Sequence, residues 1–195
     1  HGLMGRVTFY CSKDIEEIMD QIGTFHLILM DGVLEHIPLS LVGLRKRTML
    51  SLFSLLNPGG YLFISGTPNR LFPFDSHSTQ LWWIPWTKPG SEWAYSRAIK
   101  KKRHSDAPTI PNGPLGLEVR GAWGATYFEI CRYLSAQSFK CLNTIHGHDR
   151  YRYYIKHSKK HAILESLVYY IVTKWFHIPI TAFTPYLNNL VIQKC

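Results

Sequence analysis

The sequence has few acidic residues and no long apolar run. Its 13 Asp and Glu residues stand against 22 Lys and Arg residues, which gives a formal net charge of +9. No apolar stretch reaches the roughly 18 residues of a membrane-spanning helix. The start of the chain also lacks the apolar segment behind a basic flank that marks a signal peptide. These absences argue against an integral membrane protein and a secretory precursor.

Cysteine is also scarce. The four cysteines are scattered, with no C-x-x-C spacing, at Cys11, Cys131, Cys141 and Cys195. This pattern indicates neither a zinc site nor a disulfide framework, and it favours a reducing cytoplasm. His146 and His148 alternate as strand residues do, but no further ligand stands at a suitable spacing. The chain starts with His1 rather than Met, so we expect processing or a piece of a longer protein.

The excess of basic residues favours anionic partners such as nucleic acid, acidic lipid or phosphorylated substrates. A soluble protein with a solvated basic face is the more common explanation of such a charge. The sequence contains no RNA-binding signature and no helix-turn-helix pattern, so we expect no specific nucleic-acid partner.

The first half of the chain carries the pattern of an α/β protein. "FHLILM" (25–30) is a continuous apolar run, typical of a parallel strand covered on both faces. Residues 39–56 place apolar side chains at helical spacing, and "NPGG" (57–60) is expected to stop this helix in a tight turn. "YLFIS" (61–65) reads as a second buried strand. The order predicts a βαβ crossover and hence a parallel sheet.

The remaining segments predict a single domain with one long insert. Further strands are expected at 6–10, 139–145 and 189–194. Helices are expected at 124–137 and about 160–176, and a short helix or turn at 12–22. Residues 67–123 contain most of the prolines, five of the six tryptophans and the basic run 100–104. We interpret them as an elaboration above the sheet rather than a separate domain.

Three consecutive segments, "FHLILMDGVLEHIP", "LLNPGGYLFIS" and "TPNR", resemble class I S-adenosylmethionine-dependent methyltransferases of the type 11/12-like group. The similar block covers roughly residues 5–75. The resemblance implies a Rossmann-like fold, a doubly wound parallel sheet with an antiparallel last strand. It also implies ligand binding at the carboxyl ends of the strands.

One departure from the family is large. The family's first strand carries a D/E-x-G-x-G loop around the cofactor, and its second strand ends in an acidic residue for the ribose hydroxyls. Neither feature is present. We therefore expect a partial fold in which the first βαβ unit lies upstream of residue 1. A strand edge and normally buried faces would then be uncovered.

On the cofactor side, the resemblance assigns S-adenosylmethionine contacts to the end of the first predicted strand. These residues are Asp31, Gly32, Val33 and Leu34, with Asp14 as the acidic residue that reads adenine. The glycine would let backbone approach the ligand. Apart from the resemblance, Asp31–Gly32 is also typical of a plain turn.

On the acceptor side, Glu35 and His36 are the predicted catalytic residues. A histidine of near-neutral pKa suits a general base that takes a proton from the methyl acceptor. Without that role, a Glu–His pair at a helix entrance is commonly a cap or a surface pair. A similar E-x-x-E-H in ubiquinone-pathway O-methyltransferases is linked to a divalent metal. Here Gly32 replaces the first carboxylate and Asp31 is displaced by one residue, so the sequence predicts no metal site.

The loop after the second predicted strand contains polar groups among aromatics. This composition suits an apolar or ring-shaped acceptor that is oriented by a few polar contacts. A packed tryptophan-rich lid without direct contacts is the alternative. The predicted substrate-binding residues are Asn69, Arg70, Asp75, His77 and Trp82.

The sequence thus predicts a methyltransferase, with O-methyl transfer to a small-molecule, lipid or sugar acceptor. The competing hypothesis is a non-catalytic methyltransferase-like module that binds a protein partner or an acidic membrane surface. Tryptophans close to a basic run favour peripheral membrane contact in that case. Sequence leaves the acceptor and the oligomeric state open.

Overall fold

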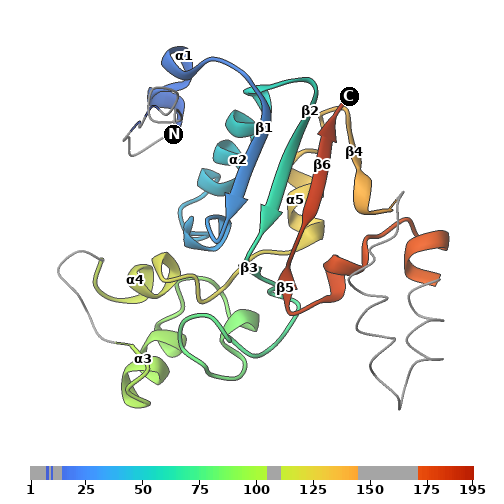
Figure 1. Ribbon diagram of the computed structural model, residues 1–195. Coiled ribbons are helices and arrows are strands. Elements are labelled where there is room, and N and C mark those ends of the chain that lie inside the picture. Colours follow the sequence, from blue (N-terminus) through green and yellow to red (C-terminus); the bar gives the residue numbers. More distant parts are fainter. Residues whose placement is uncertain (1–7, 9, 11–14, 105–110, 145–170) are drawn as a thin grey trace, which may run out of the picture.

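The computed structural model of the chain describes residues 8, 10, 15–104, 111–144 and 171–195 (Figure 1). Within these ranges the protein is a mixed α/β structure with a four-stranded mixed sheet and a two-stranded one. The α-helices are α1 (Met19–Ile22), α2 (Leu44–Ser54), α3 (Glu92–Lys100), α4 (Pro114–Val119) and α5 (Tyr127–Tyr133). The strands are β1 (Phe25–Asp31), β2 (Leu56–Ser65), β3 (Thr67–Pro68), β4 (Phe139–Cys141), β5 (Tyr186–Leu187) and β6 (Leu190–Lys194).

The predicted βαβ crossover is confirmed. β1 and β2 pair in parallel, and α2 connects them. The helix begins later than expected because Gly43, its N-cap, has a φ of +77°, a left-handed conformation that a helix cannot contain. Most residues of the expected strand at 6–10 and of the expected helix at 160–176 lie outside the described residues.

The segment 57–60 belongs to β2 instead of a separate turn, which corrects the prediction. In the pairing of the two strands, Phe25 faces Leu56 but Leu27 faces Tyr61, so the intervening residues form a bulge. Its glycines allow this irregularity: Gly59 has a φ of +78°, and a side chain on Gly60 would meet backbone oxygens of β1. The helix nevertheless ends before this segment, as expected.

The last strand is the reversed strand of the main sheet. The strand order is β1-β2-β6-β4, and β6 pairs antiparallel with both of its neighbours. β4 therefore runs parallel to β1 and β2. The side chain of Lys194 at the end of β6 donates to carbonyls of Phe53, Ser54 and Leu56, so it caps the C-terminal end of α2.

The main core lies between this sheet and the helices α2 and α5. It includes Met30 of β1, Phe53 of α2, Ile64 of β2 and Ile130 of α5. The expectation that β1 is covered on both faces is wrong. Side chains alternate along a strand, and those facing away from the core are exposed, by 63% at Leu29.

The insert lies at the carboxyl ends of β1 and β2 (Figure 1). Its buried residues form a second, smaller core. Residues of α3 and α4 pack there around Ile84 and Trp123. The insert thus lies over the end of the sheet where the sequence predicts a ligand site. No helix in the described part of the chain has the length and apolar character needed to cross a membrane.

Candidate functional site

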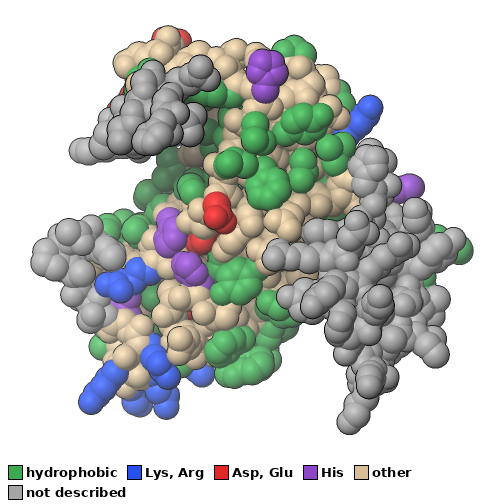
Figure 2. Space-filling view, viewed as in Figure 1, with side chains coloured by type: hydrophobic (Ala, Val, Ile, Leu, Met, Phe, Trp, Pro, Cys, Tyr) green, Lys and Arg blue, Asp and Glu red, His purple; other side chains and the backbone are tan. Residues whose placement is uncertain are grey.

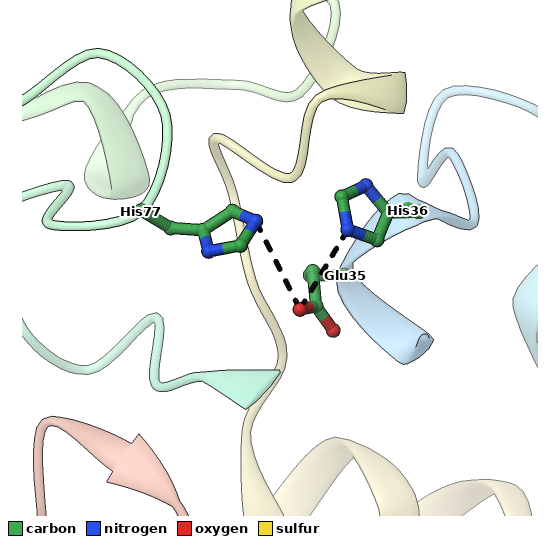
Figure 3. A group of neighbouring side chains, drawn as sticks. All are labelled: Glu35, His36 and His77. Atoms are coloured by element: carbon green, nitrogen blue, oxygen red, sulfur yellow. Dashed lines mark ion pairs between the residues drawn. The ribbon is translucent and has the colours of Figure 1, made fainter. Parts of the chain in front are cut away.

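The side chains of Glu35, His36 and His77 meet at the carboxyl end of the sheet (Figure 3). Glu35 and His36 belong to the 3₁₀ turn Leu34–His36 that follows β1, whereas His77 comes from the loop after β3. Glu35 Oε1 lies 3.8 Å from His36 Nε2 and 4.0 Å from His77 Nε2. Figure 2 shows histidine and acidic side chains adjoining near the centre of one face, between sheet and insert.

Glu35 is a buried carboxylate with only one of its oxygens hydrogen-bonded. The residue is 1% exposed. Oε2 accepts a hydrogen bond of 2.9 Å from the hydroxyl of Thr67, while Oε1 has no hydrogen-bond partner. A buried carboxylate oxygen without a donor is costly, so this oxygen is free to bind a positively charged group.

The orientation of His36 is fixed from the insert. Its Nδ1 lies 2.6 Å from the carbonyl oxygen of Val119, the last residue of α4. A carbonyl only accepts hydrogen bonds, so Nδ1 carries the proton. In a neutral ring the lone pair is then on Nε2, which is the nitrogen that faces Glu35.

His77 is positioned by Asp75, whose side chain organises the loop. Both oxygens of Asp75 are acceptors, and their donors are the backbone N–H groups of His77, Ser78 and Thr79 and two side-chain hydroxyls of the same loop. Asp75 is 1% exposed. The observed hydrogen-bond partners of its side chain all belong to the loop.

Gly121 lacks a side chain at the point where Glu35 and His77 approach each other. A Cβ on Gly121, which has a φ of +87°, would lie 2.8 Å from Cδ2 of His77 and 2.9 Å from Cγ of Glu35. Real Cβ contacts essentially never come so close. A side chain at this position would therefore push Glu35 and His77 apart.

The predicted cofactor residues adjoin the cluster. Asp31 ends β1, and the backbone N–H of Gly32 donates to Ser65 at the end of β2. Gly32 has a φ of +61°, and a Cβ there would lie 3.6 Å from Glu35 Oε1. Val33 is exposed while Leu34 is fully buried in the main core. Asp14 lies outside the described residues.

Asn69 and Arg70 take part in contacts that tie the loop after β3 to the rest of the protein. Asn69 is buried, and its amide donates to the carbonyls of Ala182 and Thr184. Arg70 lies 3.8 Å from Glu129, which also pairs with the buried Arg45. Burial lowers the pKa of Arg45 from its ordinary value, and the nearby Glu129 opposes this shift.

Three tryptophans of the insert, Trp82, Trp83 and Trp86, are about half exposed. Trp82 packs against Phe74 and Trp83, and Trp83 against Trp86. An open groove runs beside Trp86, and Arg70 and Lys88 line it together with Leu71. None of the three clustered residues lines this groove. It offers a surface for a molecule that combines an apolar part with negative charge.

Sequence reasoning missed Thr67, Val119 and Gly121. Thr67 directly follows the strand "YLFISG", so its place at a strand's carboxyl end was available as a signal. No motif marks the other two, because their role depends on how the insert folds back on the sheet. His77 was predicted as a substrate contact, but its proximity to Glu35 and His36 was not foreseen.

Comparison of the chain with protein-family models, with curated proteins and with solved structures finds no match in any of the three.

Proposed function

We propose that this chain forms part of an S-adenosylmethionine-dependent methyltransferase that methylates an oxygen of a small-molecule, lipid or sugar acceptor. The observation that carries the proposal is the reversed last strand of the main sheet. The family that the sequence resembles has a parallel sheet with an antiparallel last strand, and β6 alone is reversed among β1, β2, β6 and β4.

The position of the polar residues supports the same proposal. Ligands of open α/β sheets bind beyond the carboxyl ends of the strands. Asp31 ends β1 and Gly32 follows it, and the cluster of Glu35, His36 and His77 lies at the same end. In the proposal, Asp31 and Gly32 contact the cofactor, and Glu35, His36 and His77 lie on the acceptor side.

The reaction requires alignment more than chemical activation. The acceptor hydroxyl loses its proton, its oxygen attacks the methyl carbon of the sulfonium, and the neutral thioether leaves. Two roles suit the lone pair on His36 Nε2: it accepts that proton, or it binds a cation. The partly exposed imidazoles of His36 and His77, 42% and 30% exposed, leave the cluster accessible to an acceptor.

Calorimetric binding of S-adenosylmethionine tests the proposal. It should be measured on the 195-residue chain and on the longest natural protein that contains it. We expect weak or absent binding to the 195-residue chain, because no D/E-x-G-x-G loop is present, and clear binding to the longer protein. In the longer protein, Asp31→Ala should weaken binding at least about tenfold, the effect of losing one charged hydrogen bond.

The matched control is Asp20→Ala, which removes an exposed carboxylate of α1 away from the end of β1. It should leave the affinity unchanged. Absence of binding to the longest natural protein, or equal affinity of the Asp31 variant, would overturn the proposal.

The second candidate is a non-catalytic module that docks on an acidic membrane surface. The observation in its favour is the half-exposed tryptophan series of the insert, Trp82, Trp83 and Trp86. Exposed tryptophans near basic residues are typical of interfacial membrane binding. Sedimentation with anionic vesicles, abolished by Trp82→Ala together with Trp86→Ala, would support it if S-adenosylmethionine does not bind.

A further inference from the structure

The cluster at the end of the sheet brings three electron-rich atoms face to face. They are Oε1 of Glu35 and one ring nitrogen each of His36 and His77, and they lie within 4.8 Å of one another. The histidine–carboxylate separations of 3.8 and 4.0 Å exceed hydrogen-bonding distance. The lone pair of His36 Nε2 faces the negatively charged Oε1 of Glu35. These two groups repel each other, so the space between them favours a cation.

We propose that Glu35, His36 and His77 bind one divalent transition-metal ion, with Zn²⁺ preferred to Mg²⁺. The unpartnered and buried Oε1 of Glu35 is the anchor of the site. Two ligand atoms at about 2.1 Å from a tetrahedral zinc lie about 3.4 Å apart. The two histidine–carboxylate pairs therefore need to approach by roughly half an ångström, and the two imidazole nitrogens by at most about 1.4 Å. The exposed parts of both histidines allow such a shift.

Hydrogen bonds with neighbouring groups hold Glu35 and His36 in the orientation and tautomer that a metal ion requires. Thr67 donates to Oε2 of Glu35, which leaves Oε1 to bind as a single oxygen. The carbonyl of Val119 keeps the proton of His36 on Nδ1, so that Nε2 presents its lone pair. Metal-binding histidines commonly use their second nitrogen in this way, and such outer partners orient the ligand.

The composition of the ligand set decides which metal is preferred. Two imidazoles and one carboxylate suit Zn²⁺ and its neighbours in the transition series, whereas Mg²⁺ is bound through oxygen. Gly32 occupies the position at which the E-x-x-E-H pattern has a further carboxylate. The set of this chain is therefore poorer in oxygen and richer in nitrogen than that pattern.

Metal binding would change the role of His36. With its Nε2 lone pair donated to the ion, His36 is a ligand and not the proton acceptor expected from the sequence. When bound, the ion would supply Lewis-acid polarisation of an acceptor oxygen. The three protein ligands leave at least one coordination position open toward solvent, on the side where both imidazoles are partly exposed.

Titration of the purified chain with ZnCl₂, CoCl₂ and MgCl₂ tests the inference by calorimetry. We expect a one-to-one site for Zn²⁺ with an affinity at least about tenfold above that for Mg²⁺. Co²⁺ should produce visible absorption bands from the same site. Glu35→Gln and His77→Ala should each weaken Zn²⁺ binding by more than the roughly tenfold cost of a lost outer partner, and they should abolish the cobalt bands.

The matched control is His26→Ala, which removes an exposed histidine of β1 outside the cluster. It should bind Zn²⁺ as the unsubstituted chain does. Far-ultraviolet circular dichroism reports whether each variant is folded. If Glu35→Gln unfolds, the test rests on His77→Ala, which changes an exposed residue. Unchanged Zn²⁺ affinity in the folded variants, or equal affinity for Mg²⁺, would overturn the inference. Neither result bears on S-adenosylmethionine binding, so the two proposals fail separately.

Discussion

The imidazole Nδ1 of His36 lies 2.6 Å from the carbonyl oxygen of Val119, 83 residues further along the chain. This contact joins the turn after β1 to the end of α4 in the insert. The insert therefore does more than cover the end of the sheet, because it selects the tautomer of a site histidine.

Substituting His36 separates this contact from metal binding. In His36→Asn the side-chain amide is placed to donate to Val119 as Nδ1 does, but nothing replaces Nε2. We expect an unfolding free energy within about 0.5 kcal/mol of the unsubstituted chain, and loss of the zinc site. His36→Ala should lose the site and also about 1 kcal/mol of stability. Urea denaturation and zinc calorimetry measure the two effects, and a stable variant that still binds zinc would contradict the assignment.

Thr67→Val tests the hydrogen bond behind Glu35. Valine has nearly the shape of threonine but cannot donate to Oε2, so a buried carboxylate oxygen loses its partner. Zinc affinity should fall by roughly 10- to 100-fold, and stability by about 1–3 kcal/mol. Thr48→Val is the control, since it removes a hydroxyl that bonds only within α2; a loss of zinc affinity there would show a nonspecific effect.

Gly121→Ala tests whether the cluster needs an empty space beside it. The new Cβ would fall within 3 Å of carbons of His77 and Glu35, and the backbone has a φ of +87°. We expect a loss of about 1–3 kcal/mol from backbone strain, together with loss of the zinc site. Gly113→Ala also places alanine at a positive φ, +77°, but with nothing within 4 Å. It should cost stability and leave zinc binding intact; equal zinc affinity in both variants would refute the steric explanation.

A buried tyrosine predicts how stability depends on pH. Burial is the main cause that raises the pKa of Tyr127 above its ordinary value, and contact with Cys131 adds to it. Above pH 10 the unfolded chain releases this proton and the folded chain keeps it, so stability falls as pH rises. The slope is at most about 1.4 kcal/mol per pH unit. Urea midpoints between pH 9 and 11 should fall less steeply in Tyr127→Phe, and parallel slopes would contradict the prediction.

The crossover from β1 through α2 to β2 was predictable because local patterns determine it. A continuous apolar run, helical spacing and a proline–glycine pair each act over a few residues. The bulge at 57–60 was not predictable from sequence. Whether these residues join β2 depends on how β1 pairs with β2, and local patterns do not determine that register. Exposure of Leu29 was missed since the apolar run alone does not tell which face a helix covers.

The site was predictable only in part. Glu35 and His36 follow a recognisable strand, so their place at its carboxyl end could be inferred. The addition of His77 depends on the Asp75 loop and on contacts across the insert, which no periodicity encodes. Gly121 and Val119 act through backbone position alone, and a single sequence carries no signal for that.

The most direct test of the account is an anomalous difference map from crystals of the zinc-loaded chain. The account predicts a zinc peak bounded by Oε1 of Glu35, Nε2 of His36 and Nε2 of His77, each at about 2.0–2.2 Å. Crystals soaked in zinc with no peak among these three atoms, and with a direct hydrogen bond from a histidine to Glu35 instead, would contradict it.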